Sequence, residues 1–235
     1  MAIAELRREY NLTGMRRDQL DADPVAQFKR WFDQAEGARS AGRLRGFFIG
    51  LYKAFLALGG SRPLDVNAAT LATADRNGRP SARVVLLKGV DDRGFIFFTN
   101  YDSRKGTELA ENPRAALVFY WADLERQVCV AGDVARISRE ESEAYFKSRP
   151  RGSRLAAWAS RQSDVLENRA VLEARWQELE RQYPGETVPL PPFWGGYVLA
   201  PTRIEFWQGR PNRLHDRFRY LKQPDNAWRI ERLSP

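Results

Sequence analysis

The stretch AATLATADRNGRPSARVVLLKGVDDRGFIFFTN, residues 68–100, decides the fold. It holds three runs of strand-forming residues, AATLATAD, SARVVLLKGV and GFIFFTN, which are separated by the turn signals RNGRP and DDRG. Turn residues of this kind between apolar runs are typical of hairpins. The stretch therefore predicts consecutive antiparallel strands joined by tight turns.

Further strand-like runs follow at even spacing. Two lie directly after this stretch, RAALVFYWA at 114–122 and RQVCVAGDVARI at 126–137. The tail returns to strands with FWGGYVLA at 193–200, TRIEFWQG at 202–209, RLHDRFRYL at 213–221 and AWRIERL at 227–233. Short strands at such intervals favour an antiparallel barrel or sandwich. We therefore expect a mainly β protein with peripheral helices, built as one β-barrel domain.

Helices are predicted on both sides of the central strands. The N-terminal helix has Asp23 as a candidate N-cap and Pro24 at the first helical position. SREESEAYFKSRP at 138–150 opens with Ser138 and Glu141 at capping-box spacing. SDVLENRAVLEARWQELERQY at 163–183 predicts a longer amphipathic helix, whose apolar side consists of Val165, Leu172, Trp176 and Leu179.

Composition limits the class of protein and its partners. The chain has 235 residues, a formal net charge of +8, one histidine and one cysteine. The single Cys129 excludes an intrachain disulfide and the N-terminus has no apolar signal-type core, so we expect a cytoplasmic protein. One histidine and one cysteine cannot build the usual metal sites, so no metal is expected. The positive charge indicates an anionic partner, which could be nucleic acid, a membrane or a phosphorylated small molecule.

One segment, GRLRGFFIGLYKAFLALGG at 42–60, is strongly apolar but too short to span a bilayer. Wound as a helix over 43–60, it gathers four aromatic rings on one face, which requires a partner surface. We expect it to pack against the protein's own dimer as a peripheral element. Contact with a membrane through residues 43–60 is the less favoured alternative.

Short motifs at the predicted strand ends combine cations with hydroxyl donors: RVVLLK, TNYDSRKG, SRPRGS, RQS and RLHDR. Such donors suit phosphate monoesters, although most arginines on barrel strands belong to solvated faces. In RVVLLK, Arg83 and Lys88 lie on opposite faces of a regular strand unless a bulge intervenes. In RLHDR, Arg213 and His215 share one strand face, so the charge of Arg213 should lower the pKa of His215 and keep the ring neutral.

These motifs, in this order, resemble the pyridoxamine/pyridoxine 5′-phosphate oxidase family. The resemblance runs along nearly the whole chain, from LRREY through NPRAALVFYW, LERQV, YFKSRPRGS, VPLPPFWGGY and IEFWQGRPNRLHDR to the terminal RLSP. It implies a homodimeric, FMN-binding split β-barrel. It also implies oxidation of pyridoxine or pyridoxamine 5′-phosphate to pyridoxal 5′-phosphate, with O2 as final acceptor and hydrogen peroxide as co-product. The chain departs from the family pattern at Phe98, where a tyrosine is common.

The resemblance also carries over site residues, motif by motif. It implies that FMN is held by Arg83, Val84, Lys88, Phe98, Thr99, Ser103, Arg104, Lys105, Gln127, Gln162, Ser163, Trp207 and Arg217. It implies that the substrate is held by Arg7, Tyr10, Lys88, Tyr145, Arg149, Ser153, Arg213 and His215. Arg213 and His215 are the expected catalytic residues, and His215 acts either as a base or as a neutral positioning group.

Four regions are expected along the chain. Residues 1–40 form an N-terminal helical segment that covers the active site, and residues 41–62 form the apolar insertion, expected to be helical. Residues 63–192 form the FMN-binding split barrel with its helices. Residues 193–235 supply the C-terminal strands, the dimer contacts and part of the substrate site.

Two other functions are compatible with the sequence. Another flavin split-barrel oxidoreductase with a different substrate would share the fold, but SRPRGS and RLHDR are the substrate-side motifs and argue against it. A basic RNA- or membrane-binding module would account for the net charge and the apolar segment. Its basic residues, however, lie in discrete motifs and not in one continuous tract.

Overall fold

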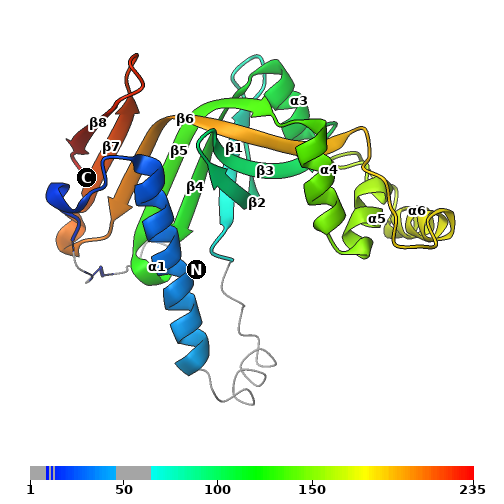
Figure 1. The fold of residues 1–235 in the computed structure, drawn as a ribbon, viewed down its shortest axis with the longest axis horizontal. Coiled ribbons are helices and arrows are strands. Elements are labelled where there is room, and N and C mark those ends of the chain that lie inside the picture. The colour runs from blue at the N-terminus through cyan, green and yellow to red at the C-terminus, as the bar shows by residue number, and fades with distance from the viewer. Residues whose placement is uncertain (1–8, 11, 13, 46–64) are drawn as a thin grey trace. The chain divides into compact units, whose positions relative to one another are not determined.

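The computed structural model describes residues 9–10, 12, 14–45 and 65–235 (Figure 1). The strands are β1 Ala68–Ala74, β2 Pro80–Asp91, β3 Gly94–Asn100, β4 Arg114–Trp121, β5 Arg126–Arg136, β6 Trp194–Gln208, β7 Asp216–Lys222 and β8 Trp228–Leu233. The α-helices are α1 Pro24–Arg45, α3 Arg104–Glu111, α4 Arg139–Ser148, α5 Arg151–Ala159 and α6 Arg169–Gln182. Short 3-10 turns are η2 Arg17–Gln19, η3 Ala122–Leu124 and η4 Pro211–Arg213.

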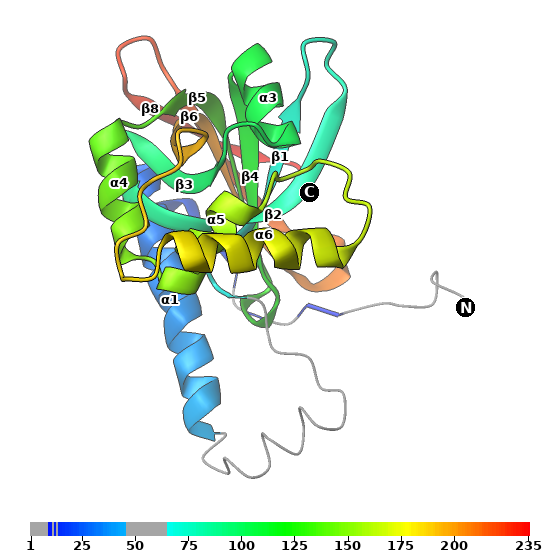
Figure 2. The same ribbon diagram turned by 90° about the vertical axis from the view of Figure 1, so that its right-hand side faces the viewer.

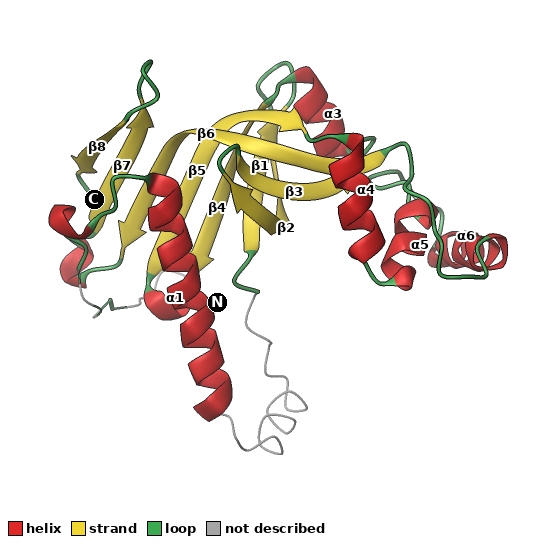
Figure 3. Ribbon diagram, viewed as in Figure 1, coloured by secondary structure: helices red, strands yellow, loops and turns green. Residues whose placement is uncertain are grey.

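The strands form one sheet in the order β3-β2-β1-β4-β5-β6-β7-β8, and β3 pairs a second time with β6. This antiparallel pairing, from Phe95 opposite Leu199 to Asn100 opposite Trp194, closes six strands into a barrel. The C-terminal hairpin of β7 and β8 extends the sheet beyond β6 (Figure 3). The expected fold class, a mainly β barrel with peripheral helices, is confirmed.

The predicted hairpin between β2 and β3 depends on a glycine. Gly94 has φ +139°, and a Cβ at this position would lie 2.0 Å from the carbonyl oxygen of Leu199. Only glycine combines this backbone conformation with such a close approach of a neighbouring strand. The turn signal DDRG therefore also sets the distance between β3 and β6.

The chain divides into two compact units, whose boundaries fall within β1, β4, β5 and β6. The first unit comprises Met1–Thr70, Leu117–Ala131 and Pro201–Pro235, and the second comprises Leu71–Ala116 and Gly132–Ala200. Each unit is made of segments that are separate in the sequence, whereas the sequence analysis expects four consecutive regions. Those four regions stay a prediction.

In the first unit, α1 packs an aromatic face against strand residues. Asp23 caps the helix, because its side chain accepts a hydrogen bond from the Val25 amide at 2.9 Å. Phe28 is buried against Phe119, with ring centroids 5.0 Å apart. The predicted N-cap is confirmed, and α1 continues to Arg45. The rest of the apolar segment 42–60, and so its expected packing, lies outside the described residues.

In the second unit, α4, α5 and α6 follow β5, and α5 and α6 lie side by side (Figure 2). Ser138 caps α4 as predicted, accepting from the Glu141 amide at 3.0 Å, whereas the Glu141 carboxylate pairs with Arg93 at 2.7 Å. The helix predicted from residue 163 begins only at Arg169. Val165 was expected on its apolar side but lies in the preceding loop and is 98% exposed.

A buried apolar cluster supports these helices. It consists of Phe146, Leu155, Val188, Leu190 and Trp194. Among the described residues, no helix has both the length and the apolar character needed to cross a membrane.

Candidate functional site

A cavity of about 570 Å³ opens in the second unit. Its wall combines the exposed side of β2, the end of β3, the start of α3, and α4 and α5 with the loop that follows. The lining side chains that carry polar groups or rings are Lys88, Phe98, Thr99, Asn100, Lys105, Tyr145, Arg149, Ser153, Ser160, Gln162 and Trp194. Val84 and Leu86 contribute apolar surface from β2.

The two cations of RVVLLK differ in exposure on β2. Arg83 is half-buried, whereas Lys88 is exposed and lines the cavity. The register of β2 with β3 shifts between Leu87 and Gly89, so a bulge falls at Lys88 itself.

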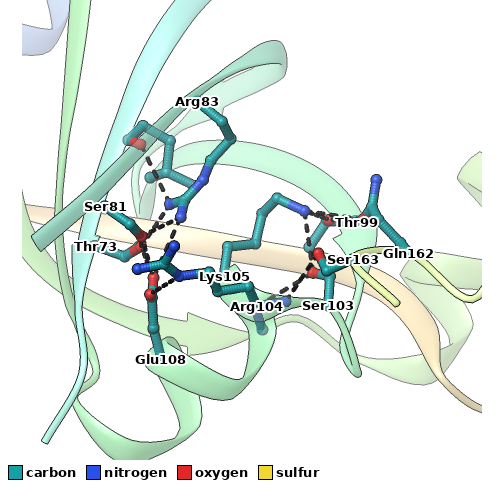
Figure 4. Close-up of polar contacts among 12 residues, drawn as sticks. Thr73, Ser81, Arg83, Thr99, Ser103, Arg104, Lys105, Glu108, Gln162 and Ser163 are labelled. Atoms are coloured by element: carbon teal, nitrogen blue, oxygen red, sulfur yellow. Dashed lines mark hydrogen bonds and ion pairs between the residues drawn. The ribbon is translucent and has the colours of Figure 1, made fainter. Parts of the chain in front are cut away.

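Lys105 lines the cavity at what we call its Lys105 end, and Figure 4 shows the polar contacts of this residue. Its ammonium group is buried and donates hydrogen bonds to Thr99 Oγ1 at 2.9 Å, Ser103 Oγ at 3.0 Å and Gln162 Oε1 at 2.9 Å. Burial first, and the charge of Arg83 second, lower the pKa of Lys105 to about 8. All three acceptors are neutral, while the nearby charge of Glu108 raises this pKa and so opposes the other two effects. An anionic ligand would add a direct charged partner for the ammonium group.

Glu108 organises the cations beside this end. The carboxylate is buried and accepts from Thr73 Oγ1 and Ser81 Oγ, both at 2.5 Å, and from Arg83 Nη2 at 3.2 Å (Figure 4). Its other oxygen accepts from Arg104 Nε at 2.9 Å. Burial alone raises the pKa of Glu108, but the hydrogen bonds outweigh it and bring the pKa to about 2. The carboxylate is therefore ionised. It holds the guanidinium group of Arg83 against α3 and pairs with Arg104 on the same helix.

The N-terminus of α3 is held by two serines. Ser103 is the N-cap and accepts from the Gly106 amide, while Ser163 Oγ accepts from the Arg104 amide at 3.1 Å. Ser163 has φ +82°, a left-handed conformation that non-glycine residues rarely adopt. Strained residues of this kind persist where the surrounding contacts fix them. The Ser163 hydrogen bond therefore joins the loop after α5 to the start of α3.

Aromatic rings and Arg149 also line the cavity, at what we call its Arg149 end. Phe98 stacks on Tyr145 with centroids 3.8 Å apart, and Trp194 lies nearly parallel to both rings, at 14° and 5°. Arg149 places its guanidinium carbon 4.6 Å from the Trp194 centroid. Its Nη1 atom is buried without a hydrogen-bond partner among the described residues, and burial lowers the pKa of the group.

The first unit contains a second group of predicted residues. Tyr10, Trp207 and His215 form an aromatic cluster in which the Tyr10 ring meets the other two edge-on, at 5.5 and 5.3 Å. His215 Nδ1 accepts from the Arg210 amide at 3.1 Å, so the neutral ring carries its proton on Nε2. Burial, and then the charge of Arg213, lower the pKa of His215. The pKa of His215 therefore shifts in the predicted direction, which favours the neutral ring.

The predicted strand over 213–221 is wrong at its start. β7 begins at Asp216, while Arg213 belongs to η4 and is exposed. Asn212 and Arg213 have φ of +56° and +62°, so the backbone turns before the strand begins. Arg213 and His215 therefore do not share one strand face. Arg217 is on β7 but is paired with Glu205, with Nη2 and Oε1 2.8 Å apart.

The predicted residues thus fall into two sets. In the second unit the cavity or its hydrogen-bonded surroundings bring together Arg83, Val84, Lys88, Phe98, Thr99, Ser103, Arg104, Lys105, Tyr145, Arg149, Ser153, Gln162 and Ser163. The first unit holds Tyr10, Gln127, Trp207, Arg213, His215 and Arg217, of which Gln127 is half-buried on β5 and lies in no described cluster. Arg7 lies outside the described residues.

Sequence reasoning gave no role to two residues that the structure places at the site. Glu108 lies one helical turn after Arg104, a spacing that allows an ion pair once the helix is recognised. Trp194 belongs to the quoted motif VPLPPFWGGY, but no periodicity or spacing in the sequence indicated that its ring contacts Arg149.

The donor set fits a ligand that carries anionic groups. Lys105 and Arg149 line the same cavity, and neither forms an ion pair within the part of the chain that the structure describes. The rings of Phe98 and Tyr145 add a flat apolar surface to the same wall. A planar aromatic ligand with a phosphate monoester would satisfy both features.

Comparison with family models gives two matches that together cover most of the chain. A model described as "Pyridoxamine 5'-phosphate oxidase" matches residues 53–183. A second, described as "Pyridoxine 5'-phosphate oxidase C-terminal dimerisation region", matches residues 194–235.

Curated relatives and solved structures agree with these models. A pyridoxine/pyridoxamine 5'-phosphate oxidase of Paraburkholderia phymatum is 53% identical over 99% of both chains, and one of Rubrobacter xylanophilus is 54% identical over 99% of this chain and 96% of its own. The structure of PhzG from Burkholderia lata, in complex with tetrahydrophenazine-1-carboxylic acid, has a TM-score of 0.81 and 31% identity, covering 97% of this chain and all of that one. A pyridoxamine 5'-phosphate oxidase-related protein from Nostoc punctiforme, at TM-score 0.59, 21% identity and coverage of 72% and 89%, shares the fold.

Proposed function

The chain belongs to the pyridoxamine 5′-phosphate oxidase family, and on that premise we propose that it oxidises pyridoxine 5′-phosphate or pyridoxamine 5′-phosphate to pyridoxal 5′-phosphate. The observation that carries the proposal is the buried Nη1 of Arg149, which has no hydrogen-bond partner among the described residues and belongs to a cavity lined by aromatic rings. A charged N–H group that is buried without a hydrogen-bond partner is costly unless a ligand supplies the acceptor. A phosphate monoester on a flat aromatic ring supplies it.

FMN is the proposed cofactor, and O2 the proposed electron acceptor. When bound, FMN would supply the two-electron chemistry, with O2 as the final acceptor. The alcohol substrate and O2 then give the aldehyde and hydrogen peroxide, while the amine substrate also consumes one water and releases ammonia. The protein's part is to bind both ligands and to orient the reacting carbon.

The Lys105 end of the cavity is the proposed place for the flavin's phosphate. The hydrogen bonds of the Lys105 ammonium go only to neutral acceptors, and Arg104 beside it contacts Glu108 through Nε. The N-terminus of α3 adds its positive dipole end to this region. The remaining residues proposed for the cofactor are Arg83, Val84, Lys88, Phe98, Thr99, Ser103, Gln127, Gln162, Ser163, Trp207 and Arg217.

The Arg149 end is the proposed place for the substrate's phosphate. Lys88, Tyr145 and Ser153 line the same wall and add a cation and two hydroxyl groups. Arg213 and His215 are proposed to act on the substrate's ring and reacting group. Since the Arg210 amide occupies Nδ1, His215 would serve as an Nε2–H donor. Arg7 and Tyr10 are proposed as part of an N-terminal cover.

The assembly and location are part of the same proposal. The match of residues 194–235 to a dimerisation region supports a homodimer. The single cysteine supports a reducing compartment, and we propose the cytoplasm.

The test begins with the purified protein. Acid-released flavin, identified by chromatography, should be FMN at about one per chain. Under air, the holoenzyme should form pyridoxal 5′-phosphate and hydrogen peroxide from the phosphorylated vitamers and not from pyridoxine. Arg149→Ala should raise KM at least about tenfold with a smaller change in kcat.

Lys147→Ala is the matched control, because Lys147 is an exposed neighbour whose one ion pair within the described part of the chain is with Glu143 on its own helix. FAD or no flavin, or a flavoprotein that oxidises neither vitamer, would contradict the proposal. A yellow protein active on another substrate would instead identify a different oxidoreductase of the same fold.

A further inference from the structure

Arg149 is half-buried and is held in an unusual way for a cation with a buried N–H group. Its guanidinium carbon lies 4.6 Å from the Trp194 ring centroid and 5.5 Å from that of Phe146. Among the described residues no carboxylate pairs with it, and its buried Nη1 has no hydrogen-bond partner. Aromatic faces therefore take the place that an acidic side chain usually fills.

Other arginines of this chain show the alternative. Arg83 and Arg104 share Glu108, and Arg217 pairs with Glu205. A carboxylate orients a guanidinium strongly, but it neutralises the charge and competes with any incoming anion. A ring face attracts the cation through its quadrupole and leaves the N–H groups in the guanidinium plane free. Only the second arrangement preserves a full positive charge for a phosphate.

Trp194 is itself fixed in orientation. It is 7% exposed and begins β6, where it lies opposite Asn100 of β3. Its ring is nearly parallel to those of Phe98 and Tyr145 and meets Phe146 edge-on at 5.2 Å. The indole plane is therefore set by strand pairing and by three rings, so the group that stacks on it is also set.

We propose that Trp194 is a positioning residue for the substrate phosphate: it holds the Arg149 guanidinium at the cavity wall without neutralising it. The proposal rests on the proposed function, since it concerns the same phosphate. It predicts that loss of the indole weakens binding of phosphorylated ligands through Arg149 and leaves ligands without phosphate unaffected.

The experiment compares Trp194→Leu and Trp194→Phe with Trp158→Leu in the FMN-loaded enzyme. Trp158 is a matched control, because it packs on the same apolar cluster but contacts Phe193 and Tyr183 and donates to the Pro189 carbonyl. Trp194→Leu should raise KM for pyridoxine 5′-phosphate about tenfold, with kcat within about twofold. Trp194→Phe should keep KM within about threefold, and Trp158→Leu should leave it unchanged.

Two further measurements separate positioning from a general structural role. In the Arg149→Ala background, Trp194→Leu should add less than about twofold to KM, since the coupled partner is already absent. The dissociation constant of pyridoxal 5′-phosphate should rise in Trp194→Leu, while that of pyridoxal should not. If the leucine variant does not fold, Trp194→Phe carries the test. It must then raise KM at least about twofold in the presence of Arg149 and have no effect in its absence.

Equal effects of Trp194→Leu with and without Arg149 would overturn the proposal, as would equal weakening of pyridoxal and its phosphate. An increase in KM of similar size in Trp158→Leu would do the same. A wild-type protein that forms no pyridoxal 5′-phosphate would instead refute the proposed function, so the two failures are distinguishable.

Discussion

Replacing Glu108 with glutamine should make the stability of the protein less dependent on acid. The carboxylate is buried under four donors, from Thr73, Ser81, Arg83 and Arg104, and its pKa lies at about 2 against an ordinary value of 4.5. A carboxyl group whose pKa is lower in the folded than in the unfolded state stabilises the folded protein at pH values above the unfolded-state pKa. This stabilisation is lost as the pH falls towards the folded-state pKa. The window therefore lies between about pH 4.5 and pH 2.

The magnitude follows from the same pKa. Each pKa unit is worth about 1.4 kcal/mol, so ionised Glu108 contributes about 3 kcal/mol to the free energy of unfolding at neutral pH. Glutamine resembles the protonated acid in shape. Glu108→Gln should therefore cost about 3 kcal/mol at pH 7, and its deficit relative to the wild type should shrink towards zero as the pH approaches about 2.

Urea unfolding of the apoprotein, followed by tryptophan fluorescence at a series of pH values, measures this difference. Glu111→Gln is the matched control, because Glu111 lies on the same helix and pairs with Arg76 at the surface, 2.5 Å from it. Its effect should be much smaller, as expected of an exposed pair. A wild-type protein and a Glu108→Gln variant with parallel stability profiles between pH 7 and about pH 2 would refute the reasoning.

Other residues give equally direct tests. The affinity of the apoprotein for FMN can be measured by flavin fluorescence. It should fall by up to about tenfold per pH unit above the Lys105 pKa of about 8, and Lys105→Arg should remove that fall. A wild-type affinity that does not change with pH would contradict this prediction. NMR titration of the only histidine should give a His215 pKa below 6.5 that rises in Arg213→Ala, and a pKa at or above 6.5 would exclude the described environment. Gly94→Ala should cost more than about 1 kcal/mol by calorimetry, because its Cβ would lie 2.0 Å from the Leu199 carbonyl oxygen; an unchanged Tm would show that the strands can separate there.

Patterns that depend on neighbours in the chain were predictable. The turn signals and apolar runs of 68–100 predicted β1, β2 and β3, and the pair Asp23–Pro24 predicted the start of α1. The helix expected from residue 163 failed because Val165 belongs to an exposed loop that holds Ser163 against α3. Apolar spacing alone did not distinguish this loop from a helical face.

Features that depend on tertiary contacts were not predictable in the same way. The two-residue spacing of Arg213 and His215 suggested a shared strand face, but consecutive left-handed residues turn the backbone before β7. The partners of Glu108 come from β1, β2 and α3, so no local pattern reveals that its charge is buried. Trp194 meets Arg149 from 45 positions away. The resemblance to a family supplied the candidate residues, and the structure shows how the described ones are held.

The uncompensated charges of the cavity also decide how this protein should be handled at the bench. Because neither Lys105 nor Arg149 forms a salt bridge among the described residues, we expect inorganic phosphate and sulfate in a buffer to compete with the phosphorylated ligands for this cavity. An anion that binds only the folded state raises the melting temperature by mass action while it raises the apparent KM of the phosphorylated vitamer. Phosphate buffers are therefore suited to storage of the protein. Kinetic measurements should use buffers with large, weakly coordinating anions at constant ionic strength.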